Sequence, residues 1–237
     1  MKKNPDLHRH IAALNAAFRQ EGYKVKLSGD HLEFREAISK IAGYSLTSPL
    51  DDRLVDLAKQ LLWIGIEDSK GRLVGIEAGR VVKAPVKAGG LNRILNDEVF
   101  GRVLPVITKL PSVNLAGRLG YLGGAWVEPK LRGNGIMSLA VQLTAAHLVR
   151  CYGVDSVFGF VRSHHVGLAL AAKGYAFTSA TVIDLMYLHG SSEAETLCMV
   201  WTDPGVLAER YAGPAAYSLR PESVQSSGVK TRKKSRH

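Results

Sequence analysis

Apolar residues recur at helical spacing in several stretches of the chain, and this pattern predicts amphipathic helices. The first helix follows Pro5, which suits a first helical turn, and ends before Gly22. The second begins at a capping box formed by Asp30 and Glu33 and ends at Gly43. The same spacing predicts further helices over residues 51–61, 91–103, 135–152 and 164–173.

Other stretches have the alternation or the short apolar runs that are typical of β-strands. Tyr23, Val25 and Leu27 alternate with polar neighbours, and two apolar runs flank the turn-rich residues 68–71, which predicts a hairpin. Four later strands are predicted at LGYLGGAWV, VDSVFGFV, AFTSATVIDLMYL and ETLCMVWTD. Helices and strands thus follow one another in the order expected of a mixed α/β sheet.

Residues 84–114 interrupt this order between the hairpin and the next strand. Pro85, Gly89, Gly90 and Pro111 bracket the segment, which we interpret as an insertion. Insertions of this length tend to be functional. The chain then divides into a helix over residues 1–22 packed on the domain, a domain over residues 23–217 that contains the insertion, and a tail over residues 218–237.

Length and composition agree with one globular domain. A chain of 237 residues is long enough for a full core, and 46% apolar with 22% charged residues is a globular balance. The net charge of +10 suggests nucleic-acid binding, but the basic residues are unevenly distributed along the chain. The tail holds six basic residues against Glu222 alone, which is half of the excess. We therefore expect a disordered basic tail on a mildly basic body.

Several function classes are disfavoured. No apolar run reaches the roughly 18 to 20 residues of a membrane span, and polar residues interrupt the amino end, so we expect a cytoplasmic protein without a membrane partner. Cys151 and Cys198 lack a CxxC spacing, which disfavours a disulfide framework and a zinc site. His164 and His165 have no third ligand at metal spacing, so no metal is expected. Cys151 is expected to be a small buried residue and not a nucleophile.

The stretch WVEPKLRGNGIMSLAVQL, residues 126–143, carries the clearest chemical signal. Pro129 ends a strand, and the next loop turns directly into a helix whose first N–H groups are unpaired. Gly133 and Gly135 keep Cβ atoms away from these amides and permit positive φ, while Arg132 adds charge. Together they predict a cradle for a phosphate group, with a spacing that differs from the Walker and dinucleotide motifs.

The residues VEPKLRGNGI resemble the acyl-coenzyme A pyrophosphate loop of the GNAT superfamily of N-acetyltransferases, written V-x-P-x-x-R-G-x-G-[IM]. The stretch AAKGYAF, with Gly174 and Tyr175 after a short helix, is similar to that family's second motif. The order of elements is also similar to the family's fold. The resemblance implies a central, splayed, mostly antiparallel sheet of about seven strands flanked by helices.

The resemblance also implies what the site binds. The pantetheine arm of acetyl-CoA would lie between the strands at residues 120–127 and 154–161, near the main chain of Trp126 and Val127. Ser163 stands where an asparagine often contacts the cofactor. An amine would attack the thioester directly in a ternary complex, with main-chain N–H groups stabilising the oxyanion. The pyrophosphate would sit on the amides of Arg132, Gly133, Asn134, Gly135, Ile136 and Met137.

Departures from the family pattern concern the acid and the base. The tyrosine that many members use to protonate the leaving thiolate aligns with Leu170, and the strand positions that hold a base in other members are Tyr121 and Gly123. The candidate bases that remain are Tyr121, Glu128, His164 and a chain of water. Simple alternation predicts that Tyr121, Gly123, Ala125 and Val127 face inward, and that Leu122, Gly124, Trp126 and Glu128 face the other side.

Three function classes stay open on the sequence. The first is an acetyl-CoA-dependent N-acetyltransferase, the second a non-catalytic acyl-CoA sensor, and the third a nucleic-acid-associated protein that makes nonspecific contacts through its tail. The acceptor is a small-molecule or a protein amine. It would be recognised by residues 43–50, by the insertion and by a loop with Glu193 and Glu195. The insertion is also a candidate contact of a homodimer.

Overall fold

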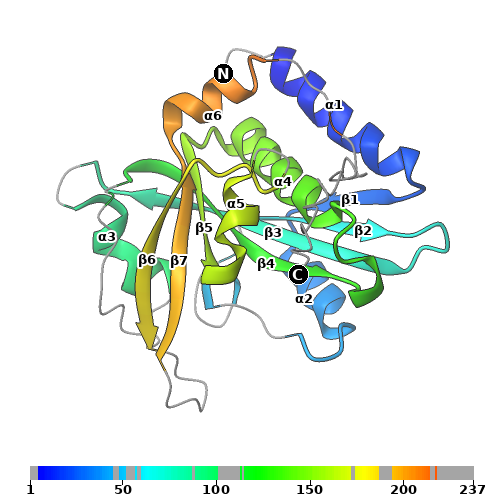
Figure 1. The fold of residues 1–237 in the computed structure, drawn as a ribbon, viewed down its shortest axis with the longest axis horizontal. Coiled ribbons are helices and arrows are strands. Elements are labelled where there is room, and N and C mark those ends of the chain that lie inside the picture. Colours follow the sequence, from blue (N-terminus) through cyan, green and yellow to red (C-terminus); the bar gives the residue numbers. More distant parts are fainter. Residues whose placement is uncertain are drawn as a thin grey trace, which may run out of the picture.

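The computed structural model describes residues 5–44, 48–51, 57, 60–86, 89–100, 113, 115–171, 174–186, 194–213 and 217. Seven strands form one sheet in the order β1-β2-β3-β4-β5-β7-β6 (Figure 1). Neighbouring strands are antiparallel except β4 and β5, which are parallel. The predicted fold class is therefore confirmed. The strands are β1 (Lys24–Ser28), β2 (Leu61–Glu67), β3 (Leu73–Ala84), β4 (Gly117–Val127), β5 (Ser156–Arg162), β6 (Ser179–Met186) and β7 (Ala194–Thr202).

Helices cover both faces of the sheet. On the first face, which we call the α4 face, α1 (Pro5–Gln20) lies beside α4 (Ile136–Tyr152), and α6 (Pro204–Arg210) joins the same apolar core (Figure 1). The opposite face, the α2 face, carries α2 (His31–Ser39), η1 (Ser48–Leu50), α3 (Gly90–Ile94) and η2 (Leu95–Val99). The remaining elements are η3 (Pro129–Leu131), η4 (Ser163–His165) and α5 (Val166–Leu170).

Alternation along β2 shows how the sequence builds two cores from one sheet. Leu62, Ile64 and Ile66 are buried in the core of the α4 face, whereas Leu61 and Trp63 are buried in that of the α2 face. A strand that is covered on both sides needs an unbroken apolar run, which is what residues 61–66 supply. The sequence assigned Leu61 to a helix, but the residue begins β2.

One histidine in the first half of α1 fixes this helix to the residues that follow α6. Nδ1 of His10 lies 2.6 Å from the hydroxyl of Tyr217, and its Nε2 lies 3.0 Å from the carbonyl oxygen of Gly213. His10 is buried, and its ring also meets Tyr211 edge-on at 5.5 Å between centroids. The two ends of the described chain are thereby joined on the α4 face.

Most predicted elements are present with shifted ends. The helix predicted over residues 91–103 begins at Gly90 and becomes the wider turn η2 at Leu95, and the helix predicted over residues 164–173 is split into η4 and α5. The helix α6 was not anticipated. Residues 52–56, 101–112 and the tail 218–237 lie outside the described residues. None of the described helices is both long and apolar enough to cross a bilayer.

The contact between β4 and β5 is short. Four residue pairs join them, from Leu119 with Ser156 to Leu122 with Gly159. Both strands then continue, since β4 pairs with β3 as far as Val127 and β5 pairs with β7 as far as Arg162. Beyond Leu122 and Gly159 the facing edges of these two described strands are unpaired. We call this opening the seam.

Candidate functional site

A glycine-lined loop leads from β4 to the first turn of α4. Gly133 and Gly135 both have left-handed backbone conformations, with φ of 82° and 77°. No side chain caps the helix, so the first N–H groups of α4 keep their hydrogen-bonding capacity for a ligand. Arg132, Gly133 and Asn134 are exposed, whereas Gly135 and Met137 are half-buried and Ile136 is buried.

The loop has the space that an anion requires. A Cβ placed on Gly133 would meet nothing within 4 Å, so the surface above these amides is open. The helix that follows has 17 residues, long enough for its dipole to attract negative charge at this end. A phosphate group therefore fits the residues present, with Arg132 beside it as a counter-charge.

A β-bulge reverses the predicted alternation along β4. Ala78 of β3 pairs with Gly123, but Ile76 pairs with Trp126, so β4 has one more residue than β3 in this stretch. Gly124 takes a φ of 68° at this bulge. Trp126 consequently packs with the core of the α2 face, as Tyr121 does, while Val127 packs with that of the α4 face. The predicted faces of Gly124, Trp126 and Val127 were therefore wrong.

Only glycine suits the centre of this bulge. A Cβ on Gly124 would lie 2.7 Å from Cδ1 of Leu50 and 3.0 Å from the hydroxyl of Tyr44. That hydroxyl donates a hydrogen bond of 2.7 Å to the carbonyl oxygen of Gly124. Burial raises the pKa of Tyr44, so the phenol keeps its proton and remains a donor at neutral pH. The bulge is thus held from the α2 face.

Tyr121 lies in the core and does not face solvent. It is 2% exposed, and its ring lies close to those of Phe158 and Phe160, at 5.6 and 6.0 Å between centroids. Its hydroxyl lies above Gly123, where a Cβ would approach it to 2.3 Å. As a candidate base Tyr121 would need a route for the proton through this aromatic cluster.

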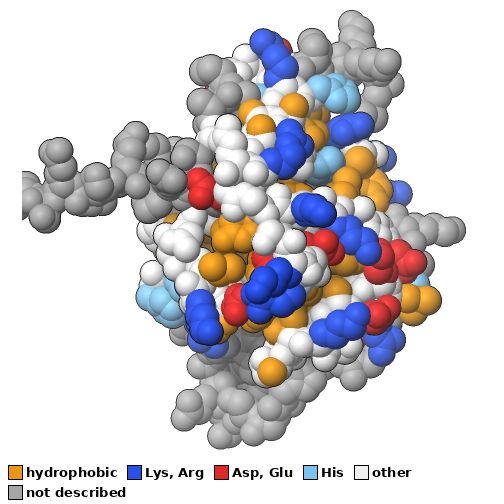
Figure 2. All heavy atoms as spheres, turned by 90° about the vertical axis from the view of Figure 1, so that its right-hand side faces the viewer, with side chains coloured by type: hydrophobic (Ala, Val, Ile, Leu, Met, Phe, Trp, Pro, Cys, Tyr) orange, Lys and Arg blue, Asp and Glu red, His pale blue; other side chains and the backbone are white. Residues whose placement is uncertain are grey.

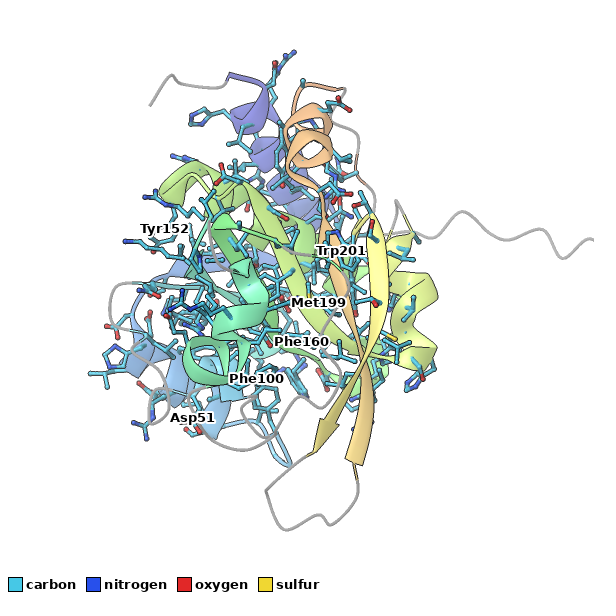
Figure 3. All side chains as sticks on the ribbon, turned by 90° about the vertical axis from the view of Figure 1, so that its left-hand side faces the viewer. Asp51, Phe100, Tyr152, Phe160, Met199 and Trp201 are labelled. Atoms are coloured by element: carbon cyan, nitrogen blue, oxygen red, sulfur yellow. The ribbon has the colours of Figure 1, made fainter. Side chains whose placement is uncertain are left out.

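The described part of the insertion closes the α2 face over these rings. Phe100, which follows η2, lies 5.1 Å from Phe160 between ring centroids (Figure 3). Arg80 of β3 is buried, and its guanidinium donates to the carbonyl oxygens of Glu98 and Val99. Desolvation lowers the pKa of Arg80 to about 10. Residues 89–100 are therefore a packed cover of the sheet.

Glu128 and Trp126 line a cleft on the α2 face. The cleft has a volume of about 650 Å³ and lies between α2, the β2–β3 turn and the end of β4. Figure 2 shows acidic and basic side chains around exposed apolar atoms on the side of the molecule that carries this turn. The apolar lining includes Trp63 and Leu73, and the acidic lining consists of Glu33, Glu36, Glu67 and Glu128.

The charges of this cleft do not all cancel. Lys26 pairs with Glu33, Lys40 with Glu36 at 2.7 Å, and Arg72 with Asp68 at 2.7 Å. Within the described residues, Glu67 and Glu128 form no salt bridge. Four glutamates and three basic side chains line the cleft, and a cation would be attracted to the unpaired Glu67 and Glu128 and to the indole of Trp126.

The other predicted residues lie around the seam without forming a cluster. Ser163 begins η4 directly after β5 and is exposed, as are His164 and His165, whose rings meet edge to face at 4.1 Å between centroids. Leu170 is exposed at the end of α5. Among the described residues, no group of three or more His, Cys, Asp or Glu side chains is placed to hold a metal. Cys151 is exposed at the end of α4, so the prediction of a buried residue was wrong.

Glu77 could not be singled out from the sequence. It lies in β3 between Ile76 and Ala78, in a run that indicates only a strand. The side chain is 1% exposed, and no described residue hydrogen-bonds its Oε2 atom. Desolvation raises the pKa of this carboxyl well above its ordinary value. A buried carboxyl without a partner for one oxygen is rare in proteins and marks a candidate functional group.

No protein-family model matches the chain, and no curated protein matches it. Similar solved structures include NAA60 of Arabidopsis thaliana in complex with acetyl-CoA, at 11% identity and a TM-score of 0.49, covering 77% of this chain and 99% of that one. The spermidine/spermine N-acetyltransferase SpeG of Vibrio cholerae is 10% identical with a TM-score of 0.47, covering 84% and 99%. The ribosomal-protein-S5-alanine acetyltransferase of Vibrio fischeri is 14% identical with a TM-score of 0.45, covering 77% and 93%.

Proposed function

We propose that this protein is an N-acyltransferase that transfers an acetyl or similar acyl group from acyl-CoA to a primary amine by direct attack in a ternary complex. The observation that carries the proposal is that β4 borders the seam and leads directly into the anion-binding loop at residues 132–137. β4 and β5 are unpaired beyond Leu122, and the cradle begins at Arg132, five residues after β4 ends at Val127. A ligand with a pyrophosphate and a long polar arm fits this arrangement, with the pyrophosphate on the loop and the arm along the seam.

The chain's own groups have separate tasks in this proposal. The amides of residues 132–137 and the guanidinium of Arg132 hold the pyrophosphate. Main-chain groups of β4 beyond Leu122 hold the pantetheine arm as an adjoining strand would. Gly124 and Ala125 have no partner residue in β3, and we assign the stabilisation of the oxyanion to a main-chain N–H of this bulge. The acyl-CoA supplies the activated thioester.

The cleft on the α2 face supports an amine as the acceptor. It ends at Trp126 and Glu128, on the last residues of the strand that would hold the acyl group. Its excess of carboxylate would draw a cationic amine from solvent, and Glu128 could take a proton from it near the end of β4. The insertion and the loop with Glu193 and Glu195 complete the expected acceptor side, although residues 187–193 lie outside the described part of the chain.

The first test is calorimetric binding of acetyl-CoA and of CoA. Arg132→Glu should weaken both by roughly tenfold or more, because it replaces a charge-assisted contact with repulsion. Arg150→Glu is the matched control: it changes the net charge equally, on an exposed side chain at the opposite end of α4. Gly135→Trp, which fills the cradle, should abolish binding. Equal affinities in all four proteins would mean that this loop is only a helix start.

The second test is thiol release with acetyl-CoA and a panel of amines, namely spermidine, free lysine and a short peptide with a free amino terminus. Turnover with any of them establishes the transferase and names its acceptor class. Tight binding of acetyl-CoA without turnover across the panel would favour the non-catalytic sensor over the enzyme.

A further inference from the structure

Glu77 occupies the position in β3 that faces the bulge. Its neighbours Ile76 and Ala78 pair with Trp126 and Gly123, so Glu77 lies opposite Gly124 and Ala125, the two residues of β4 without a partner in β3. Ile76 and Ala78 belong to the core of the α2 face. By alternation the side chain of Glu77 leaves the strand on the α4 face, as does that of its partner Ile64 in β2.

Two tyrosines locate the carboxyl more closely. Tyr44 packs against the core of the α2 face, and its hydroxyl is bound to Gly124 at 2.7 Å. Tyr175 packs against the core of the α4 face. The charge of Glu77 contributes to raising the pKa of both hydroxyls, so its carboxyl lies within electrostatic range of groups on the two sides of the sheet. We therefore locate the carboxyl of Glu77 at the bulge of β4, between Tyr44 on one face and Tyr175 on the other.

The environment favours the acid form of this carboxyl. The side chain is 1% exposed, and no cationic group contributes to its pKa, which desolvation alone raises. Arg80, two residues along β3, points instead to Glu98 and Val99 on the α2 face. A carboxylic acid beside the bulge of β4, the strand whose other edge borders the seam, can give a proton and take one back, which the aligned Leu170 cannot do.

We propose that Glu77 transfers the proton from the acceptor amine to the departing thiol in the acyl transfer, an inference that rests on the proposed function. The neutral amine attacks the thioester carbonyl, and its N–C bond forms as the C–S bond breaks. The Glu77 acid protonates the sulfur as it leaves. The resulting carboxylate accepts the proton that the new amide nitrogen releases, which restores Glu77 and balances the reaction.

The test compares Glu77→Gln, Glu77→Asp and wild type with acetyl-CoA and the best amine of the panel. Gln matches the shape of the protonated side chain but cannot exchange a proton, so kcat should fall by roughly 100-fold or more while the affinity for acetyl-CoA is kept. Asp keeps the acid at a shorter reach and should retain more activity than Gln. Glu209→Gln, a change to an exposed glutamate of α6, is the control and should leave kcat unchanged.

The pH dependence provides a readout that a structural role would not change. The ratio of wild-type to Glu77→Gln turnover cancels the titration of the amine, and it should fall as pH rises through the raised pKa of Glu77. The facing hydroxyls of Tyr44 and Tyr175 do not interfere, since the pKa of Tyr175 is about 12 and that of Tyr44 is raised further.

Three outcomes would overturn the proposal. Turnover of Glu77→Gln within threefold of wild type would show that no proton passes through this residue. Higher activity in Gln than in Asp, or loss of acetyl-CoA affinity in step with kcat, would assign Glu77 a packing role. If wild type itself neither binds acetyl-CoA nor releases thiol, the proposed function fails and this inference fails with it.

Discussion

The hydroxyl of Tyr44 donates a hydrogen bond of 2.7 Å to the carbonyl oxygen of Gly124, although the two residues are 80 positions apart in the sequence. The bond joins the segment after α2 to the one point of β4 where the ladder with β3 is interrupted. The shape of the bulge therefore depends on a side chain from a different part of the chain.

Tyr44→Phe should destabilise the protein by about 1–3 kcal/mol, because it leaves the Gly124 carbonyl without this donor on the α2 face. The free energy of unfolding in urea measures the effect. Tyr175→Phe removes the hydroxyl of a half-buried residue that makes no side-chain hydrogen bond within the described residues, and it should change stability by less than about 0.5 kcal/mol. A similar loss in both variants would contradict the role assigned to this bond.

The buried acid of Glu77 has a predictable influence on stability. Its pKa is raised in the folded protein, so the folded state holds a proton that the unfolded chain releases above its ordinary pKa. Wild type should therefore lose stability, relative to Glu77→Gln, as pH rises from about 4.5. Urea unfolding of both proteins between pH 4 and pH 8 measures the difference, and a constant difference over this range would show that the carboxyl is not held as an acid.

His147 of α4 should act in the opposite direction. Desolvation, with a contribution from Arg150, lowers its pKa to about 4, and its Nδ1 atom has no partner in the described residues. The unfolded chain binds a proton at a higher pH than the folded protein, so this residue costs stability as pH falls from about 6.5 towards 4.

Replacing His147 removes that loss. His147→Leu and His147→Gln should both show a flatter decline of the urea midpoint between pH 7 and pH 5 than wild type. At pH 7 the leucine variant should be the more stable of the two, since it leaves no buried polar atom unpaired. An unchanged slope in both variants would assign the acid sensitivity to other groups.

Arg80 should fix the described part of the insertion to the sheet. Arg80→Met keeps much of the buried stem but removes the donors to the carbonyl oxygens of Glu98 and Val99, at an expected cost of about 1–3 kcal/mol. Limited proteolysis should cut faster within residues 89–100 of the variant. Arg93→Met, on the exposed side of α3, is the control and should match wild type in both measurements.

What the sequence predicted depends on how local each feature is. The loop at Gly133 and Gly135 could be recognised because proline, glycine and a following apolar helix determine it within a few residues. The order of the elements followed from periodicity for the same reason. The predicted boundaries of elements differ from the observed ones where tertiary contacts determine them. Leu61 is an example, because its apolar character suits a buried helix and a buried strand equally well.

The missed features involve pairing between distant residues. Alternation along β4 was extended past Gly124 because nothing in GYLGGAWV states how it aligns with β3, and one extra residue exchanges the two faces. Glu77 reads as an ordinary polar position of a strand until both faces are known to be covered. The exposure of Cys151 depends in the same way on what lies beyond the end of α4.

The short contact of β4 with β5 gives this sheet edges in its interior. A strand edge usually lies at the margin of a sheet, where it attracts other strands. Here two facing edges lie in the middle, and the same helix, α4, connects the halves that they separate. Any extended molecule that bonds to both edges acts as an additional strand and ties the halves together. The force needed to pull the two halves of the sheet apart should therefore rise when such a ligand is bound, and it reports on ligand binding.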